Sequence, residues 1–168
     1  IIFTEGFFYR HPPHISDIIK IINENEIGEL ISMESSFGLN LLTKKKLFFF
    51  KKKKKINPSG RLFNTDLGGG CILDLGCYPS SFSLLIASLI KTIDYKNFKM
   101  LDIKKDIGKT GVDIDASAVI QFEGGFTSVI KSSFKNDVGS QSIIKGKKGS
   151  IKIHDTWFGD VIKKTIGN

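Results

Sequence analysis

Residues 116–134 read Ala-Ser-Ala-Val-Ile-Gln-Phe-Glu-Gly-Gly-Phe-Thr-Ser-Val-Ile-Lys-Ser-Ser-Phe, and this stretch decides the fold class. Two runs rich in Val, Ile, Phe, Thr and Ser, 116–122 and 126–134, flank Glu123-Gly124-Gly125, whose composition is typical of a hairpin turn. Two similar short runs follow, separated by Gly146-Lys147-Lys148-Gly149. Because such tight turns join antiparallel strands, the last third of the chain predicts an antiparallel sheet.

Two helices are predicted, both before the strand-rich last third of the chain. Between residues 14 and 27, isoleucines recur at helical spacing opposite acidic and basic residues, which predicts an amphipathic helix lying on another element. A second, more apolar helix is predicted over 79–91, where Pro79 suits a first helical turn. Early helices and late strands together predict one α+β domain over residues 1–168, an open, mainly antiparallel sheet with helices on one face.

The positive charge of the chain is concentrated in one segment. The formal net charge is +8, from 25 basic and 17 acidic residues, and eight of the lysines lie in the Lys/Phe-rich low-complexity segment 44–55. Without those eight, basic and acidic residues are equal in number, at 17 each. Basic residues interleaved with aromatic ones could bind single-stranded nucleic acid or a membrane surface. We favour a solvated surface loop, because one short segment has no second basic element with which to form a groove.

Other features of the sequence indicate the cellular compartment and whether this chain binds a cofactor. The only cysteines, Cys71 and Cys77, have no Cys or His neighbours at metal-ligand spacing, so we expect free thiols, no metal site and a cytoplasmic protein. No run approaches the roughly 18 apolar residues of a membrane span. The first residue, Ile1, is not Met, and we expect the chain to be part of a longer protein. No Gly-x-Gly-x-x-Gly motif follows an opening strand, and Gly68-Gly69-Gly70 is a poor candidate for a cofactor loop.

Two clusters of polar residues are candidates for chemistry. Asp74 and Tyr78 stand in an apolar stretch just before a helix, where the phenol could exchange a proton with a substrate. Alternatively, Asp74 caps the helix and Tyr78 packs with its hydroxyl at the surface. Tyr9, Arg10 and His11 could likewise bind an anion or substrate, or be surface groups beside a helix start. Spacing alone leaves both alternatives open.

A resemblance adds to this interpretation. The runs Glu5 to Pro12, Ile27 to Ile31 and Gly68 to Pro79 resemble, in this order, the C-terminal domain of the Gfo/Idh/MocA oxidoreductase family. The later strands and turns from Gly111 to Ile151 are similar to those of the family's sheet domain, so the resemblance covers essentially the whole chain. Tyrosine at position 78, where many members carry histidine, resembles the branch that includes dihydrodiol dehydrogenase and D-xylose dehydrogenase.

The resemblance implies an enzyme and assigns roles within it. It implies hydride transfer between NAD or NADP and a CH-OH group of a sugar, polyol or cyclic diol. Tyr78 would transfer the proton, Asp74 would orient the substrate or tune the local field, and Tyr9, Arg10 and His11 would bind the substrate. The family's N-terminal Rossmann domain and its catalytic lysine would lie before Ile1, so we expect this chain to bind no cofactor and to be inactive alone.

The predicted sheet also suggests a partner. Helices cover one face, and the other, partly apolar face needs cover, so we expect a homodimer through it. A small-molecule substrate is the second expected partner, and neither nucleic acid nor a membrane is expected. The alternative function is a non-catalytic oligomerisation or ligand-binding module derived from the same family.

Overall fold

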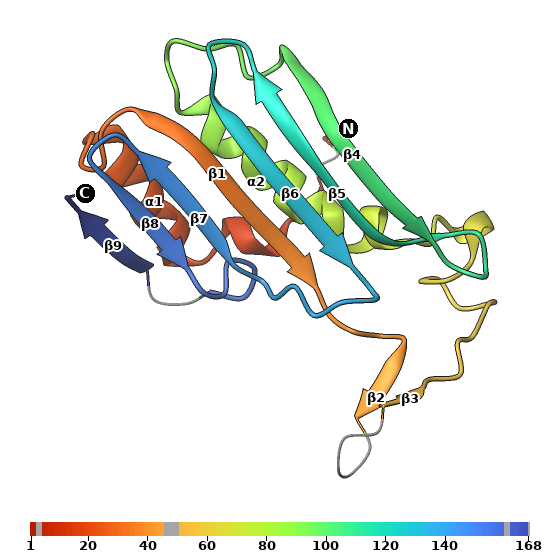
Figure 1. Ribbon diagram of the computed structural model, residues 1–168. Coiled ribbons are helices and arrows are strands. Elements are labelled where there is room, and N and C mark those ends of the chain that lie inside the picture. Colours follow the sequence, from red (N-terminus) through yellow and green to blue (C-terminus); the bar gives the residue numbers. More distant parts are fainter. Residues whose placement is uncertain (3–4, 46–50, 160–161, 168) are drawn as a thin grey trace.

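The computed structural model describes residues 1–2, 5–45, 51–159 and 162–167. Its centre is a seven-stranded sheet with the strand order β4-β5-β6-β1-β7-β8-β9. The strands are β1 (Leu30–Gly38), β4 (Phe98–Ile107), β5 (Asp113–Phe122), β6 (Thr127–Ser133), β7 (Ser142–Gly146), β8 (Gly149–Ile153) and β9 (Ile162–Ile166). Two α-helices, α1 (Pro13–Asn23) and α2 (Cys77–Ser88), lie behind the sheet in Figure 1. Helices on one face of an open sheet confirm the predicted fold class.

Neighbouring strands of the sheet are antiparallel except at its centre, where β1 and β6 are parallel. The turn at Glu123 to Gly125 joins β5 to β6 as predicted, and the turn at Gly146 to Gly149 joins β7 to β8. The order places β1, from the first quarter of the chain, between strands from the last third. The complete sheet therefore forms only when strands that are distant in the sequence pair with each other.

The helices differ from their predicted bounds at the ends. The first was expected over 14–27 but ends at Asn23, and Asn25 then adopts a left-handed backbone with a φ of 56°. The second was expected over 79–91 but begins at Cys77, directly after a π-helical turn, η3 (Ile72–Gly76). Pro79 has no N–H, so it cannot donate to the carbonyl of Leu75 in an α-helical bond, and this favours the widened turn before it.

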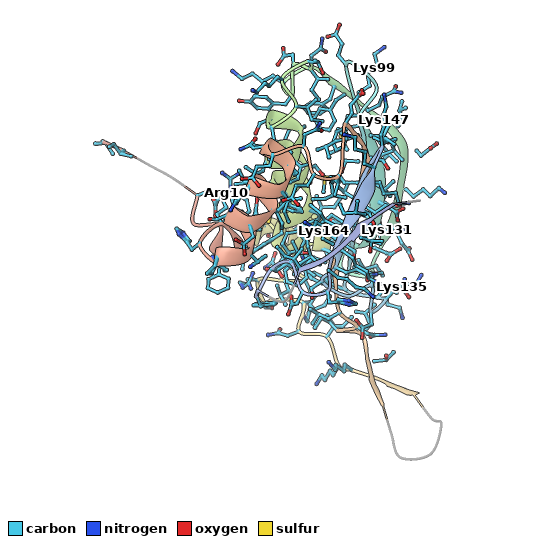
Figure 2. The ribbon with its side chains drawn as sticks, turned by 90° about the vertical axis from the view of Figure 1, so that its left-hand side faces the viewer. Arg10, Lys99, Lys131, Lys135, Lys147 and Lys164 are labelled. Atoms are coloured by element: carbon cyan, nitrogen blue, oxygen red, sulfur yellow. The ribbon has the colours of Figure 1, made fainter. Side chains whose placement is uncertain are left out.

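The core lies between the sheet and the helix layer, which Figure 2 shows edge-on. Phe82 and Ile86 of α2, Ile15 and Ile18 of α1, and strand residues such as Met33 are buried there. A pair of buried serines joins α2 to β6 in the same layer: the hydroxyl oxygens of Ser83 and Ser128 lie 2.5 Å apart. Both hydroxyls are buried and each has a hydrogen-bond partner, so a hydrogen bond as well as apolar contacts holds α2 on the sheet.

In the part of the chain that the structure describes, the opposite face of the sheet carries no helix and is mostly polar. Residues paired across neighbouring strands share a face, and the register places Leu101, Val119 and Val129 next to one another across its middle. Glu34 follows in the same row and separates these three residues from Ile143. Around this row the register places lysines, serines and threonines: Lys99, Lys104, Lys131, Lys145, Lys152, Lys163, Ser32, Ser36, Ser117, Ser150, Thr127 and Thr165. The apolar part of this open face is therefore narrow.

The Lys/Phe-rich segment, expected as a loop over 44–55, forms a short hairpin where it is described. Thr43–Lys45 (β2) pairs antiparallel with Lys51–Lys53 (β3), and the hairpin projects from the end of the sheet in Figure 1. The side-chain oxygen of Asn40 accepts bonds from the backbone N–H groups of Leu42 (3.1 Å) and Thr43 (2.9 Å) and turns the chain into it. Residues 46–50 lie outside the described part.

One stretch is long and apolar enough to cross a membrane. Residues Thr65–Ser88, which include α2, have a mean hydropathy of 1.3 over the best window, and half of that window is buried inside the protein. A core helix of a soluble protein passes the same test, and here α2 packs on β1 and β6.

Candidate active site

A hollow of about 250 Å³ lies beside the start of α2 and contains the predicted catalytic pair. Asp74 and Tyr78 both line it, together with Arg61 from the preceding loop and Glu5 from the N-terminal segment. The rest of its wall is Gly6, Phe7, Leu62, Leu67, Gly68, Gly69, Leu73 and Cys77. A larger, shallower hollow between α1 and β9 contains His14, Asp17 and Lys164 but no phenol. The hollow at Asp74 and Tyr78, named the tyrosine cavity below, is therefore the candidate active site.

The triple-glycine segment has a structural role next to this cavity. Gly70 has a φ of 122°, and its N–H donates to the carbonyl of Leu62 at 3.0 Å. A side chain at Gly70 would collide with the carboxylate of Asp113 on β5. That carboxylate accepts a bond from the N–H of Ile72 at 2.7 Å. The glycine turn thus brings the first turn of η3 against β5 and lets Asp113 satisfy a free backbone donor at its start.

The capping role considered for Asp74 is filled by Asp113. The N-cap residues of η3 and α2, Cys71 and Gly76, make no side-chain capping bond of their own, and the carboxylate of Asp74 bonds to the guanidinium of Arg61. The Oδ1–Nη1 distance is 2.5 Å, with 20% of the Asp74 side chain exposed and 73% of Arg61. Asp74 is therefore held at the cavity wall by an ion pair, with its charge available to the cavity.

Tyr78 is half-buried in a cluster of aromatic rings. Its ring centroid lies 5.3 Å from Phe37, 5.5 Å from Phe7 and 5.7 Å from Trp157. No hydrogen bond to its hydroxyl occurs within the described residues, although the cavity is lined by polar groups. Burial raises the pKa of the Tyr78 phenol, and the acidic groups of Cys77, Asp74 and Glu5 nearby raise it further. The phenol thus stays protonated at neutral pH, which is the form that can donate a proton.

The second predicted cluster lies next to this cavity but does not line it. Tyr9 is fully buried, its ring 6.2 Å from that of Tyr78, and its hydroxyl is 2.9 Å from the hydroxyl of Ser81 on α2. Arg10 donates to the same hydroxyl at 3.1 Å, and its guanidinium carbon lies 5.9 Å from the Tyr9 ring. His11 is exposed. Tyr9 and Arg10 thus fix the N-terminal segment on α2, and contact of these three residues with substrate stays a prediction.

Both cysteines are free thiols near the site. Cys77 lines the tyrosine cavity, and burial raises the pKa of its thiol. Cys71 is fully buried against Ser132, and burial raises the pKa of its thiol to about 12. Both thiols therefore remain neutral near pH 7 and are poor nucleophiles. Among the described residues, no group of three or more His, Cys, Asp or Glu side chains could hold a metal ion.

The sequence interpretation missed Arg61 and Glu5. The signal for Arg61 was available: the chain has two arginines, Arg10 and Arg61, among 25 basic residues, and each bonds to a group at or near the start of α2. Arginine recurs where a planar, multiply donating cation is required. Glu5 gave no comparable signal.

The sequence of the chain matches a known family. Residues 15–152 fit the family model described as the GFO/IDH/MocA C-terminal domain. The chain belongs to this family. Because that match covers most of the chain and the order of its elements, the resemblance inferred from the sequence is confirmed.

Relatives in this family are named oxidoreductases. The chain is 25% identical over 158 residues to a trans-1,2-dihydrobenzene-1,2-diol dehydrogenase of Xenopus tropicalis, covering 94% of this chain and 42% of that protein. It is 28% identical over 130 residues to D-xylose 1-dehydrogenase (NADP(+)) 2 of Haloferax volcanii, covering 77% and 34%. The chain thus spans less than half the length of these relatives.

Solved structures agree on the fold. A 3-ketoreductase from Actinomadura kijaniata, in complex with NADP and TDP-benzene, superimposes with a TM-score of 0.73 at 16% identity, covering 99% of this chain and 49% of that one. An aldose-aldose oxidoreductase from Caulobacter crescentus, complexed with glycerol, gives a TM-score of 0.72 at 17% identity, covering 96% and 44%. At these identities the likeness concerns the GFO/IDH/MocA fold alone.

Proposed function

We propose that this chain is the substrate-binding and catalytic half of an NAD(P)-dependent oxidoreductase acting on CH-OH groups of sugars, polyols or cyclic diols. The observation that carries the proposal is the tyrosine cavity, in which a protonated phenol without a bound partner in the described residues faces an ion-paired carboxylate. The named relatives oxidise or reduce diols and sugars.

The residues of the cavity suit proton transfer to a substrate oxygen. Tyr78 donates its proton when a carbonyl is reduced and takes it back when the alcohol is oxidised. Asp74, held by Arg61, is placed to accept a hydrogen bond from a neighbouring hydroxyl of the substrate. The hydride itself would be supplied or accepted by the nicotinamide of NAD or NADP.

The walls of the cavity fit a ring-sized ligand and not a whole dinucleotide. Its volume of about 250 Å³ is below the roughly 300–1,000 Å³ of a complete ligand pocket. Leu67 and Leu73 line it yet expose 60% and 64% of their surface. Exposed leucines at a polar cavity favour cover by another part of the protein, which agrees with a cofactor domain elsewhere in the full-length protein.

The proposal includes a homodimer and a cytoplasmic location. The short apolar row of Leu101, Val119 and Val129 on the open face would lie at the centre of the dimer, with Glu34, lysines and serines around it. The free thiols of Cys71 and Cys77 support a reducing compartment such as the cytoplasm. A Val129→Asp change should convert the dimer to a monomer in light scattering, and a wild-type monomer would contradict this part.

The test is a pair of measurements on the full-length protein. Titration with NADPH and NADH, followed by nicotinamide fluorescence, should show binding, and a screen of sugars and diols should show turnover. Tyr78→Phe should then lower kcat by about 100-fold or more, because the proton donor is lost, while cofactor binding is retained. Retained turnover in Tyr78→Phe would refute the proposed role. Absence of cofactor binding would favour a non-catalytic ligand-binding or oligomerisation module.

A further inference from the structure

The loop before the glycine turn places Arg61 with little freedom in its backbone. Leu62 accepts the bond from Gly70, and the ring of Phe63 packs 5.6 Å from that of Phe134, a fully buried core residue. The N–H of Gly69 donates to the carbonyl of Asn64 at 2.8 Å. The Arg61 backbone is therefore fixed by the residues that follow it, although the side chain itself is largely exposed.

The guanidinium of Arg61 meets Asp74 on the wall of the tyrosine cavity. Within the described residues, this is the only side chain bonded to the Asp74 carboxylate. The ion pair does not anchor the loop, because backbone bonds and Phe63 already do so, and exposed ion pairs contribute about 0–1 kcal/mol to stability. The Arg61–Asp74 ion pair is therefore not required to hold the loop, and this indicates that it has a role in the cavity.

We propose that Arg61 is a positioning residue for the reaction of Tyr78: its guanidinium holds the Asp74 carboxylate at the cavity wall and balances its charge beside the phenol. This inference rests on the proposed function. Arg61 acts on Tyr78 through Asp74, and neither the substrate nor the reacting atoms need to touch it.

The groups that face Tyr78 come from several elements. They are Asp74 and Cys77 from the same helical stretch, Glu5 from the N-terminal segment and Tyr9 from the turn before α1, and Arg61 from the loop lines the same cavity. Of these, only Arg61 is cationic. Its removal leaves the Asp74 carboxylate, its bonded partner, beside the phenol without a balancing charge. Negative charge nearby favours the protonated phenol, so proton release from Tyr78 becomes harder.

Two substitutions should therefore shift the reaction in opposite directions. Arg61→Met should lower kcat about tenfold and move the alkaline limb of the pH profile upward by about 0.5 unit or more. Asp74→Asn should move that limb downward, because one negative charge is removed. The double variant should match Asp74→Asn alone, because Arg61 acts through that carboxylate. A purely structural role for Arg61 predicts no movement of the limb.

The experiment measures kcat against pH for wild type, Arg61→Met, Arg61→Lys, Asp74→Asn and the double variant in the full-length protein. Arg61→Lys should recover part of the activity, because the charge is kept while the planar fork is lost. Lys135→Met is the matched control: it removes an exposed ion pair of 2.6 Å with Asp106, and Lys135 does not line the cavity. The control should leave kcat and the pH profile unchanged.

Two outcomes separate this inference from the proposed function. If Tyr78→Phe is inactive while Arg61→Met keeps wild-type kcat and an unshifted limb, the role of Arg61 is overturned and the proposed function stands. If Tyr78→Phe keeps full turnover, the proposed function fails whatever Arg61 does. A readout without substrate is the ionisation of Tyr78 followed by nuclear magnetic resonance of isotope-labelled tyrosine, in which Arg61→Met should raise the Tyr78 pKa and Asp74→Asn should lower it. An unmoved titration in Arg61→Met also overturns the inference.

Discussion

Replacement of Gly70 by alanine tests how the glycine turn supports the site. The φ of 122° at Gly70 strains any side chain, which costs roughly 1–2 kcal/mol. The new methyl group would also collide with the carboxylate of Asp113, which then loses its bond to the N–H of Ile72, a further loss of about 1 kcal/mol as for a helix cap. We expect Gly70→Ala to lower the free energy of unfolding by about 2–3 kcal/mol.

Gly125 offers a matched control for the strain alone. It also has a positive φ, 95°, but no atom lies within 4 Å of the place where a side chain would begin. Gly125→Ala should therefore cost only about 1–2 kcal/mol. Both variants are measured by urea unfolding, followed through the fluorescence of Trp157, the one tryptophan of the chain, which is fully buried. Equal losses in the two variants would refute the collision with Asp113.

Two further predictions concern buried polar groups. Tyr9→Phe removes the buried bond to Ser81 and should cost about 1 kcal/mol in the same unfolding assay, whereas Tyr78→Phe should cost less than about 0.5 kcal/mol, because its hydroxyl has no partner in the described residues. Equal costs would contradict this difference. The folded state keeps Cys71 protonated up to about pH 12, against an ordinary pKa of 9.0, so the stability contributed by this neutral thiol is lost as pH rises above 9. Between pH 8 and pH 10.5, wild type should lose about 2 kcal/mol relative to Cys71→Ala, and parallel losses would exclude the effect.

The sequence predicted the parts of the fold that follow regular patterns. The strands on either side of Glu123 to Gly125 and the two helices were all identified from periodicity and turn residues. The edge strand β4 was missed, because a bulge between Leu101 and Lys104 interrupts its alternation and three of its residues are lysines. The edge strand β9 was missed for a related reason, since Lys163 and Lys164 hide the strand pattern. Lysines on edge strands limit pairing with other chains, and the same lysines interrupt the apolar alternation from which a strand is predicted.

The sequence placed the two candidate catalytic residues together, but it did not reveal the residues that contact them from other elements. Asp74 and Tyr78 lie four residues apart in the sequence, and their local spacing is enough to place them in one cavity. Arg61 and Asp113 reach the same segment from 13 and 39 residues away from Asp74, through a loop and through β5. Such contacts depend on the packing of the sheet, which periodicity does not encode.

The contacts of Arg61 and Asp113 explain why the carboxylate of Asp74 lies at the cavity wall and does not cap the helix that follows it. A helix start has free N–H groups that attract the nearest carboxylate, and Asp74 is the nearest in sequence. Asp113 reaches the first of these groups from β5, and Arg61 draws Asp74 toward the cavity. The position of Asp74 therefore depends on the pairing of β5 with β4, because Asp113 is paired there with Ile107. Any change that loosens this end of β5 should disturb the site before it unfolds the helix.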